Sequence, residues 1–140
     1  SNFPWYFETE LRTPETTPAV AIWINEQTYA QQLQQGNNVT MSITLDPRSR
    51  NGNLSDYWVK AMTPFGTFWL NEHMQFVASE VPIRAYGGPL VNISALSLFE
   101  DATGQLPPGL YSVYFAVDDN MDGIYDGTFK SSVIFTIQSS

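Results

Sequence analysis

Residues 111–117 read Tyr111-Ser112-Val113-Tyr114-Phe115-Ala116-Val117, residues 118–127 read Asp118-Asp119-Asn120-Met121-Asp122-Gly123-Ile124-Tyr125-Asp126-Gly127, and residues 132–137 read Ser132-Val133-Ile134-Phe135-Thr136-Ile137. In the first and third of these runs an apolar residue stands at every second position. A period of two over six or seven residues is typical of a strand with one buried face. The sequence therefore predicts two neighbouring strands joined by an acidic loop.

The same alternation recurs earlier in the chain. It is clearest at residues 39–45, and shorter apolar runs at residues 19–24, 57–62 and 67–70 are separated by turn signals. Residues 26–35 have some helical character but no apolar stripe, so we expect a loop or a single helical turn there. The pattern predicts an all-β fold, an antiparallel two-sheet β-sandwich with about seven or eight strands.

A length of 140 residues favours one domain. We divide the chain into an N-terminal arm rich in aromatic residues and proline, residues 1–18, and a single β-sandwich domain, residues 19–140. Within that domain, Trp58 is expected to be the large core aromatic of a central strand. The sequence Tyr-Gly-Gly-Pro at residues 86–89 is expected to form a turn.

Composition limits the classes of partner. Charged residues make up 14% of the chain, against a typical value of about 25%, and the net charge is −8. Because the six basic residues are scattered, the sequence disfavours nucleic-acid binding. No apolar run approaches the roughly 18 residues of a membrane span. The low charge and abundant Ser, Thr, Asn and Gln are typical of a secreted protein, so we expect an extracellular or cell-surface location.

The sequence offers no convincing catalytic constellation. His73 is the only histidine and cysteine is absent, which leaves few routes to nucleophilic catalysis. Glu100 and Asp101 are adjacent, and neighbouring side chains on a strand point to opposite faces. We therefore expect a protein that is not an enzyme.

The acid-rich run carries the one motif with a chemical meaning. Its pattern is Asp-x-Asn-x-Asp-Gly-x-x-Asp, which is similar to the first nine positions of an EF-hand or dockerin-type calcium loop. Calcium prefers six to eight oxygen ligands, and Gly123 permits the sharp turn that such a loop needs. Position twelve is Phe129, so the closing acidic ligand is missing, and a weak site with a dissociation constant of about 10⁻⁴ to 10⁻³ M is expected. The predicted ligands are Asp118, Asn120, Asp122, the carbonyl of Ile124, and Asp126.

A different interpretation of the same loop remains open. Asp and Gly are also the residues that tight turns prefer, so the run is compatible with a solvated hairpin loop without an ion. The repulsion of four carboxylates in a short loop favours a bound cation over this alternative.

Aromatic residues are the second functional indication. Exposed tryptophan and tyrosine side chains stack on sugar rings or anchor protein partners. The candidates are Trp5, Tyr6 and Trp23, and each of them is also compatible with packing on the domain itself. The arm that carries Trp5 and Tyr6 is further expected to add as a strand to the exposed sheet edge of a neighbouring molecule.

Two resemblances support this interpretation. The run Leu106-Pro107-Pro108-Gly109-Leu110-Tyr111-Ser112-Val113 resembles the corner of fibronectin type III and immunoglobulin-like sandwiches, in which a tyrosine hydrogen-bonds back across the corner. A second set of blocks follows in order along the chain: Val39-Thr40-Met41-Ser42-Ile43-Thr44-Leu45-Asp46-Pro47, Asp56-Tyr57-Trp58-Val59, Thr63-Pro64-Phe65-Gly66, Gly88-Pro89-Leu90, and residues 106–126. With these blocks, residues 37–138 look like an uncharacterised module of secreted proteobacterial proteins. This second resemblance implies a β-sandwich and export from the cell, and it names no activity.

Together these observations predict a non-catalytic extracellular structural or adhesive module with a calcium-stabilised hairpin loop, and a subunit of a cell-surface assembly is one form that such a module takes. The rival prediction is a carbohydrate-binding module that uses exposed Trp and Tyr side chains.

Overall fold

The computed structural model describes residues 16–101 and 104–139 and confirms the predicted all-β fold. The described residues form ten strands and one short 3₁₀ helix, η2 (Arg48–Arg50). Seven longer strands build the sandwich, and three short ones (β2, β6 and β7) were not counted in the prediction of seven or eight. The strands are β1 (Ala19–Ile24), β2 (Gln31–Gln34), β3 (Val39–Asp46), β4 (Leu54–Thr63), β5 (Gly66–Leu70), β6 (Phe76–Ala78), β7 (Tyr86–Pro89), β8 (Ile93–Asp101), β9 (Gly109–Asp118) and β10 (Phe129–Gln138).

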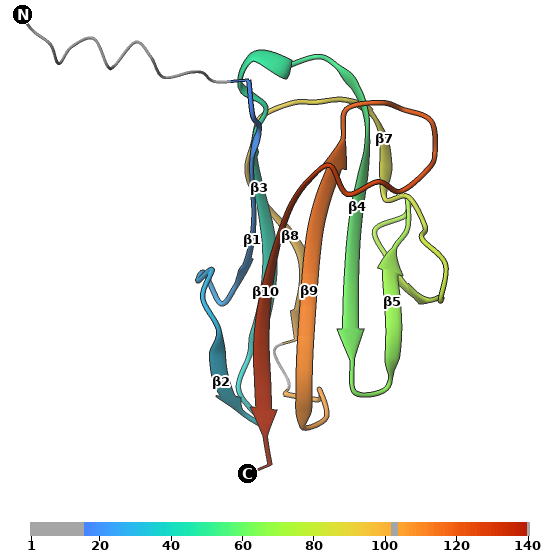
Figure 1. Cartoon of the computed structure of the whole chain (residues 1–140). Coiled ribbons are helices and arrows are strands. Elements are labelled where there is room, and N and C mark those ends of the chain that lie inside the picture. The colour runs from blue at the N-terminus through green and yellow to red at the C-terminus, as the bar shows by residue number, and fades with distance from the viewer. Residues whose placement is uncertain (1–15, 102–103, 140) are drawn as a thin grey trace, which may run out of the picture.

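The strands lie in two facing sheets (Figure 1). The smaller sheet has the order β1-β3-β8, and the larger has the order β2-β10-β9-β4-β5-β6, with β7 paired to one end of β4. All of these pairs are antiparallel except β10 with β2, which is parallel. This order is the immunoglobulin-like one, with β3 and β8 in one sheet facing β4, β9 and β10 in the other.

The pairing of the last two long strands is confirmed. β9 and β10 run antiparallel, with Tyr111 opposite Phe135 and Val113 opposite Val133. The rings of Tyr111 and Phe135 stack with centroids 4.8 Å apart. The Tyr111 hydroxyl donates a hydrogen bond of 2.7 Å to the carbonyl of Pro107, four residues earlier. This is the tyrosine corner that residues 106–113 predicted.

The main core lies between the two sheets. Every second residue of β3, β9 and β10 is buried there, as the period of two requires. We call this layer the inter-sheet core. Its fully buried members, with at most 1% of their surface exposed, are Ile22, Ile24, Leu90, Val113, Phe115 and Val117.

One local prediction was wrong in part and another was wrong. Residues 26–30 form a loop, as expected, but residues 31–34 form β2, which pairs in parallel with the end of β10 and places Leu33 beside Ile137. The backbone of β2 finds its hydrogen-bond partners on the edge of β10. No local pattern predicts this pairing, since the two segments are about a hundred residues apart in the sequence. Residues 86–89, expected to be a turn, form β7 against the first half of β4, with Gly88 opposite Ser55.

The glycines of β7 explain that second difference. A Cβ atom built on Gly87 lies 2.5 Å from the guanidinium of Arg84, and one built on Gly88 lies 2.6 Å from the hydroxyl of Tyr86. The two glycines therefore allow the Arg84 and Tyr86 side chains to lie close against the strand, and a larger residue would displace them. Most of the predicted N-terminal arm, residues 1–15, lies outside the described part of the chain.

Candidate functional site

The acid-rich loop, residues 119–128, folds over the outer face of the larger sheet. In Figure 1 it leaves the end of β9 and swings across β4 beside β7 before it returns into β10. Alternation along β4 sends Tyr57 and Val59 into the inter-sheet core, so Asp56 and Trp58 must point outward. Both are nevertheless buried, with 0% and 2% of their surface exposed, because the outer face is covered at this end of the strand.

A second apolar cluster lies on this outer face. We call it the outer core, and it consists of buried Trp58, Trp69 and Ala116 with the partly buried Ile83 and Tyr125 packed against them. The Tyr125 ring from the loop meets both indoles edge-on, with centroids 5.4 Å from Trp58 and 5.6 Å from Trp69. Trp58 is therefore a core residue, but of the outer core.

Asp118, the last residue of β9, binds the end of the loop. Its carboxylate is fully buried and accepts three hydrogen bonds: from the Trp58 indole N–H at 3.0 Å, the Asp126 backbone N–H at 2.8 Å and the Thr128 backbone N–H at 2.7 Å. A buried carboxylate is tolerated only when such donors replace its water shell. Asp118 therefore fixes both the end of the loop and the orientation of an outer-core tryptophan.

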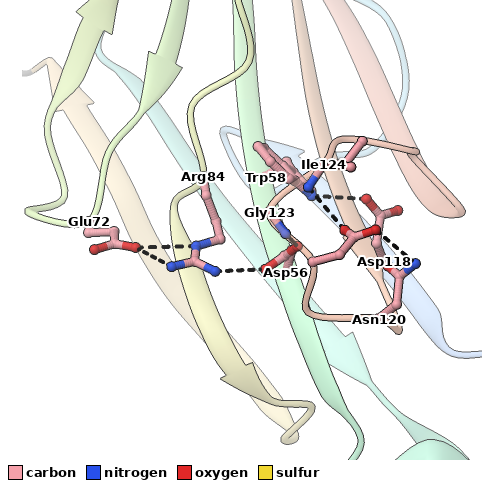
Figure 2. A network of polar contacts seen from close by, with 9 residues as sticks. Asp56, Trp58, Glu72, Arg84, Asp118, Asn120, Gly123 and Ile124 are labelled. Carbon is pink, nitrogen blue, oxygen red and sulfur yellow. Dashed lines mark hydrogen bonds and ion pairs between the residues drawn. The ribbon is translucent and has the colours of Figure 1, made fainter.

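Asp56 on β4 binds the middle of the loop in the same way. It is also fully buried, and it accepts a hydrogen bond from the Gly123 backbone N–H at 2.8 Å and from the Arg84 guanidinium at 3.0 Å. Figure 2 shows the chain of contacts continuing from Arg84 to Glu72, at 3.1 Å. Hydrogen bonds to Asp56 and then to Glu72 raise the pKa of Arg84 above its usual value. Gly123, at the centre of the loop, has a φ of +75°, which agrees with the sharp turn expected there.

The two buried carboxylates repel each other. Asp56 and Asp118 lie directly opposite each other in the register of β4 and β9, where like charges repel. Burial, followed by the nearby charge of Asp118, raises the pKa of the Tyr125 hydroxyl. Outside this pair, Arg50 forms an ion pair with Asp119 and lies 5.0 Å from the centre of the Phe129 ring. Arg50 of η2 thus contacts both the start of the loop and the start of β10.

The predicted calcium ligands are only partly brought together. Asp118 is buried beneath the loop, whereas Asn120, Asp122, Ile124 and Asp126 are exposed. The Asp122 carboxylate accepts the Ile124 N–H at 3.0 Å and lies 3.5 Å from the Asn120 side-chain nitrogen. Across residues 16–101 and 104–139, no group of three or more His, Cys, Asp or Glu side chains is placed to hold a metal ion. In this arrangement the first acid of the motif serves as an acceptor for backbone N–H groups.

The predicted aromatic site has one described member. Trp5 and Tyr6 lie outside the described residues, and Trp23 is half-buried on the outer face of the smaller sheet. Its indole N–H donates to the Thr44 hydroxyl at 3.0 Å. His73 is exposed in the turn between β5 and β6.

Sequence reasoning missed Asp56 and Arg84. Asp56 stands two residues before Trp58, so both side chains lie on the same, outward face of the strand. A large tryptophan on that face indicates that another part of the chain covers it, and Asp56 is then covered as well. Arg84 gave no such signal, because its contact with Asp56 depends on how the segment between β6 and β7 folds.

The fold and this site define the chain as an immunoglobulin-like two-sheet β-sandwich module with a loop docked on one sheet. Among solved structures it is similar to the CARDB domain of a Pyrococcus furiosus protein, crystallised in complex with di-metal ions. The match covers 91% of this chain and 100% of that one, at 8% sequence identity and a TM-score of 0.42. No family model matches the sequence, and no curated protein matches it at a significant level. None of the helices in the described segments has the length and apolar character to cross a membrane.

Proposed function

We propose that this protein is a non-catalytic structural or adhesive β-sandwich module that acts outside the cell or at its surface. The observation that carries the proposal is the use of the two buried carboxylates. Three of the donors to Asp56 and Asp118 are backbone N–H groups of the loop, and the other two are the Trp58 indole and the Arg84 guanidinium, so every partner is part of the fold. Charged groups that catalyse a reaction need a reacting partner within hydrogen-bond reach, and these are committed to structure.

The wider arrangement agrees with a structural role. The exposed His73 belongs to a turn that also carries Glu72, whose carboxylate is bound by Arg84. The low content of charged residues, 14%, supports a location outside the cell. The direct test is a screen of the purified protein for hydrolase and transferase activities. Turnover that His73→Ala or Asp56→Asn abolishes would overturn the proposal.

Calcium binding at residues 118–126 is part of the proposal. The motif supplies oxygen atoms at the spacing that calcium loops use, and four of its five predicted ligands are exposed to solvent. Because Asp118 already accepts three hydrogen bonds, an ion would either use the exposed oxygens without it or exchange with those bonds. Either route agrees with weak affinity.

Isothermal titration with calcium tests this part. We expect saturable heat in the range of about 10⁻⁴ to 10⁻³ M and a melting temperature that falls when a chelator is added. Asp122→Ala should remove the heat, whereas Asp46→Ala, at an exposed acid outside the loop, should leave it unchanged. No heat, together with a melting temperature that does not respond to chelator, excludes the calcium site without affecting the proposal of a structural module.

Assembly through the N-terminal arm is the second part. The smaller sheet ends at β8, which pairs on one side only, with β3, among the described residues. Such an edge is a site where an extended segment of another molecule adds as a strand. Sedimentation of the full chain and of a variant without residues 1–12 tests it. The same oligomeric state and stability for both would exclude the arm as the assembling element.

The rival function is carbohydrate binding through exposed aromatic side chains. It is favoured by Tyr29 and Tyr86, which are 60% and 52% exposed, and by the half-buried Trp23. Affinity electrophoresis against a panel of polysaccharides separates the two functions. Retardation on one polysaccharide that Trp23→Ala removes would favour the rival, and migration unaffected by every sugar would exclude it.

A further inference from the structure

A cavity lies between the two sheets at the end of the sandwich opposite the docked loop. Its volume is about 220 Å³, and strands of both sheets contribute to its wall. At this end β3 and β9 begin and β4 ends, so the cavity is a gap at one end of the inter-sheet core. Among its lining residues are Val39, Ala61, Phe68, Phe99, Val113 and Phe135.

The wall offers almost no polar contact. Its two hydroxyl groups, on Thr63 and Tyr111, are already hydrogen-bonded. The Thr63 hydroxyl donates to the Gly66 carbonyl at 2.7 Å and accepts the Phe65 N–H at 3.1 Å, and the Tyr111 hydroxyl donates to the Pro107 carbonyl at 2.7 Å. Since an ordered water molecule needs two to four polar partners, this wall offers no position that would hold one.

The cavity is accessible from outside. Phe65, at its rim, is 52% exposed and packs edge-on against Phe68 and Tyr111, with centroids 5.5 and 6.3 Å away. Phe65, Phe99 and Leu106 also line a second, more open depression, which adjoins the first and has Glu100 among its lining residues. A ligand can therefore reach the inner space by displacing the Phe65 ring, without separation of the sheets.

We propose that this cavity is a binding site for a small, uncharged aromatic molecule of one or two fused rings. An engineered apolar cavity of about 150 Å³ in another protein stays dry and binds benzene, so 220 Å³ suits a substituted benzene or an indole. Five phenylalanine rings in the wall offer edges and faces for aromatic contact: Phe65, Phe68, Phe76, Phe99 and Phe135. The acidic rim at Glu100 disfavours carboxylated ligands. This site is separate from the docked loop, so it does not depend on the function proposed above.

The test uses the full chain, with toluene and indole as probes. Titration followed by the NMR signals of the Val39 and Met41 methyl groups should show saturable shifts, and the melting temperature should rise with probe concentration. Ala61→Leu places three more carbon atoms in the cavity. It should weaken binding by about tenfold or more and, because it fills empty space, raise the melting temperature of the free protein.

Two further variants keep the test decisive. Ala61→Val fills less of the space and should weaken binding to a smaller degree, which covers the case that the leucine variant does not fold. Ala95→Leu, at an exposed position of β8, should bind both probes as the wild type does. The proposal is overturned if neither probe binds saturably, or if Ala61→Leu binds as tightly as the wild type. It is also overturned if the unliganded protein already shows contacts between the Val39 methyls and an aromatic ring of residues 3–7, because the chain would then fill its own cavity.

Discussion

The inter-sheet core and the outer core bury aromatic and aliphatic side chains equally well, yet they are built by different means. In the inter-sheet core, burial follows the alternation of each strand, and residues such as Phe115 and Val133 meet others of the same kind from the opposite sheet. In the outer core, Trp58 and Trp69 stand on the face of the larger sheet that is turned away from its partner. They are buried because the β9–β10 loop brings Tyr125 across them.

The difference lies in what holds each core closed. Two sheets need only apolar contact, which is non-directional and tolerant of small shifts. A ten-residue loop has too little apolar surface for that and is held by directed hydrogen bonds to Asp56 and Asp118. The outer core should therefore be sensitive to the loss of single polar atoms, and the inter-sheet core to the loss of volume.

The largest expected effect is in the inter-sheet core. Phe115→Ala removes a fully buried ring and leaves a cavity, so we expect the free energy of unfolding to fall by about 3–5 kcal/mol. Urea denaturation followed by circular dichroism measures it. Ile134→Ala on β10, where the side chain is 46% exposed, is the control and should cost less than about 1 kcal/mol. A loss below about 2 kcal/mol for Phe115→Ala would mean that the sheets do not depend on this contact.

The next effect concerns the polar support of the loop. Asp118→Ala leaves the Trp58 indole and the Asp126 and Thr128 N–H groups without their acceptor, which should lower the free energy of unfolding by about 2–4 kcal/mol. Repulsion from Asp56 disappears at the same time and keeps the loss from being larger. Asp122→Ala, at an exposed acid of the same loop, should cost about 1 kcal/mol or less. Equal losses for the two variants would contradict the role of Asp118 as the buried acceptor that holds the loop.

The two cores also differ in how far the sequence predicted them. The alternation at residues 39–45 and 111–117 gave the strands, the pairing of β9 with β10 and the tyrosine corner, because the hydrophobic period and the corner motif are local. Which face of β4 would be covered was not local. Trp58 was placed in a core from its size, but the alternation alone cannot say that a loop some sixty residues later covers the outer face.

The candidate site shows the same limit more sharply. The spacing of acids in residues 118–126 predicted a set of oxygen ligands, and it could not show that Asp118 is buried between the outer face of the larger sheet and the loop. That orientation follows from the phase of β9, since Val117 faces the inter-sheet core and the next residue must face outward. Continuing the strand alternation into the motif would have predicted it. The partner Arg84 depends on tertiary contacts and had no sequence signal.

A sharper test of the outer core compares its two tryptophans. Trp58→Phe removes the indole donor to Asp118, whereas Trp69→Phe removes an indole N–H that is buried without a hydrogen-bond partner among the described residues. Both variants lose a similar ring area, so the difference reports the hydrogen bond to a charged acceptor. We expect Trp58→Phe to be less stable than Trp69→Phe by about 1–3 kcal/mol in urea denaturation. Indistinguishable variants would show that the outer core depends on apolar contact alone.

The smallest expected effect is at the tyrosine corner, which belongs to the inter-sheet core but is held by a polar atom. Tyr111→Phe keeps the ring that stacks on Phe135 and removes only the hydroxyl that donates to Pro107. Because the Pro107 carbonyl lies near solvent and water can replace the lost donor, we expect a loss of about 1 kcal/mol. Tyr29→Phe, with 60% of the side chain exposed, is the matched control and should change nothing measurable. A loss at Tyr111 as large as that of Asp118→Ala would remove the contrast, because the inter-sheet core would then depend on single polar atoms as much as the docked loop does.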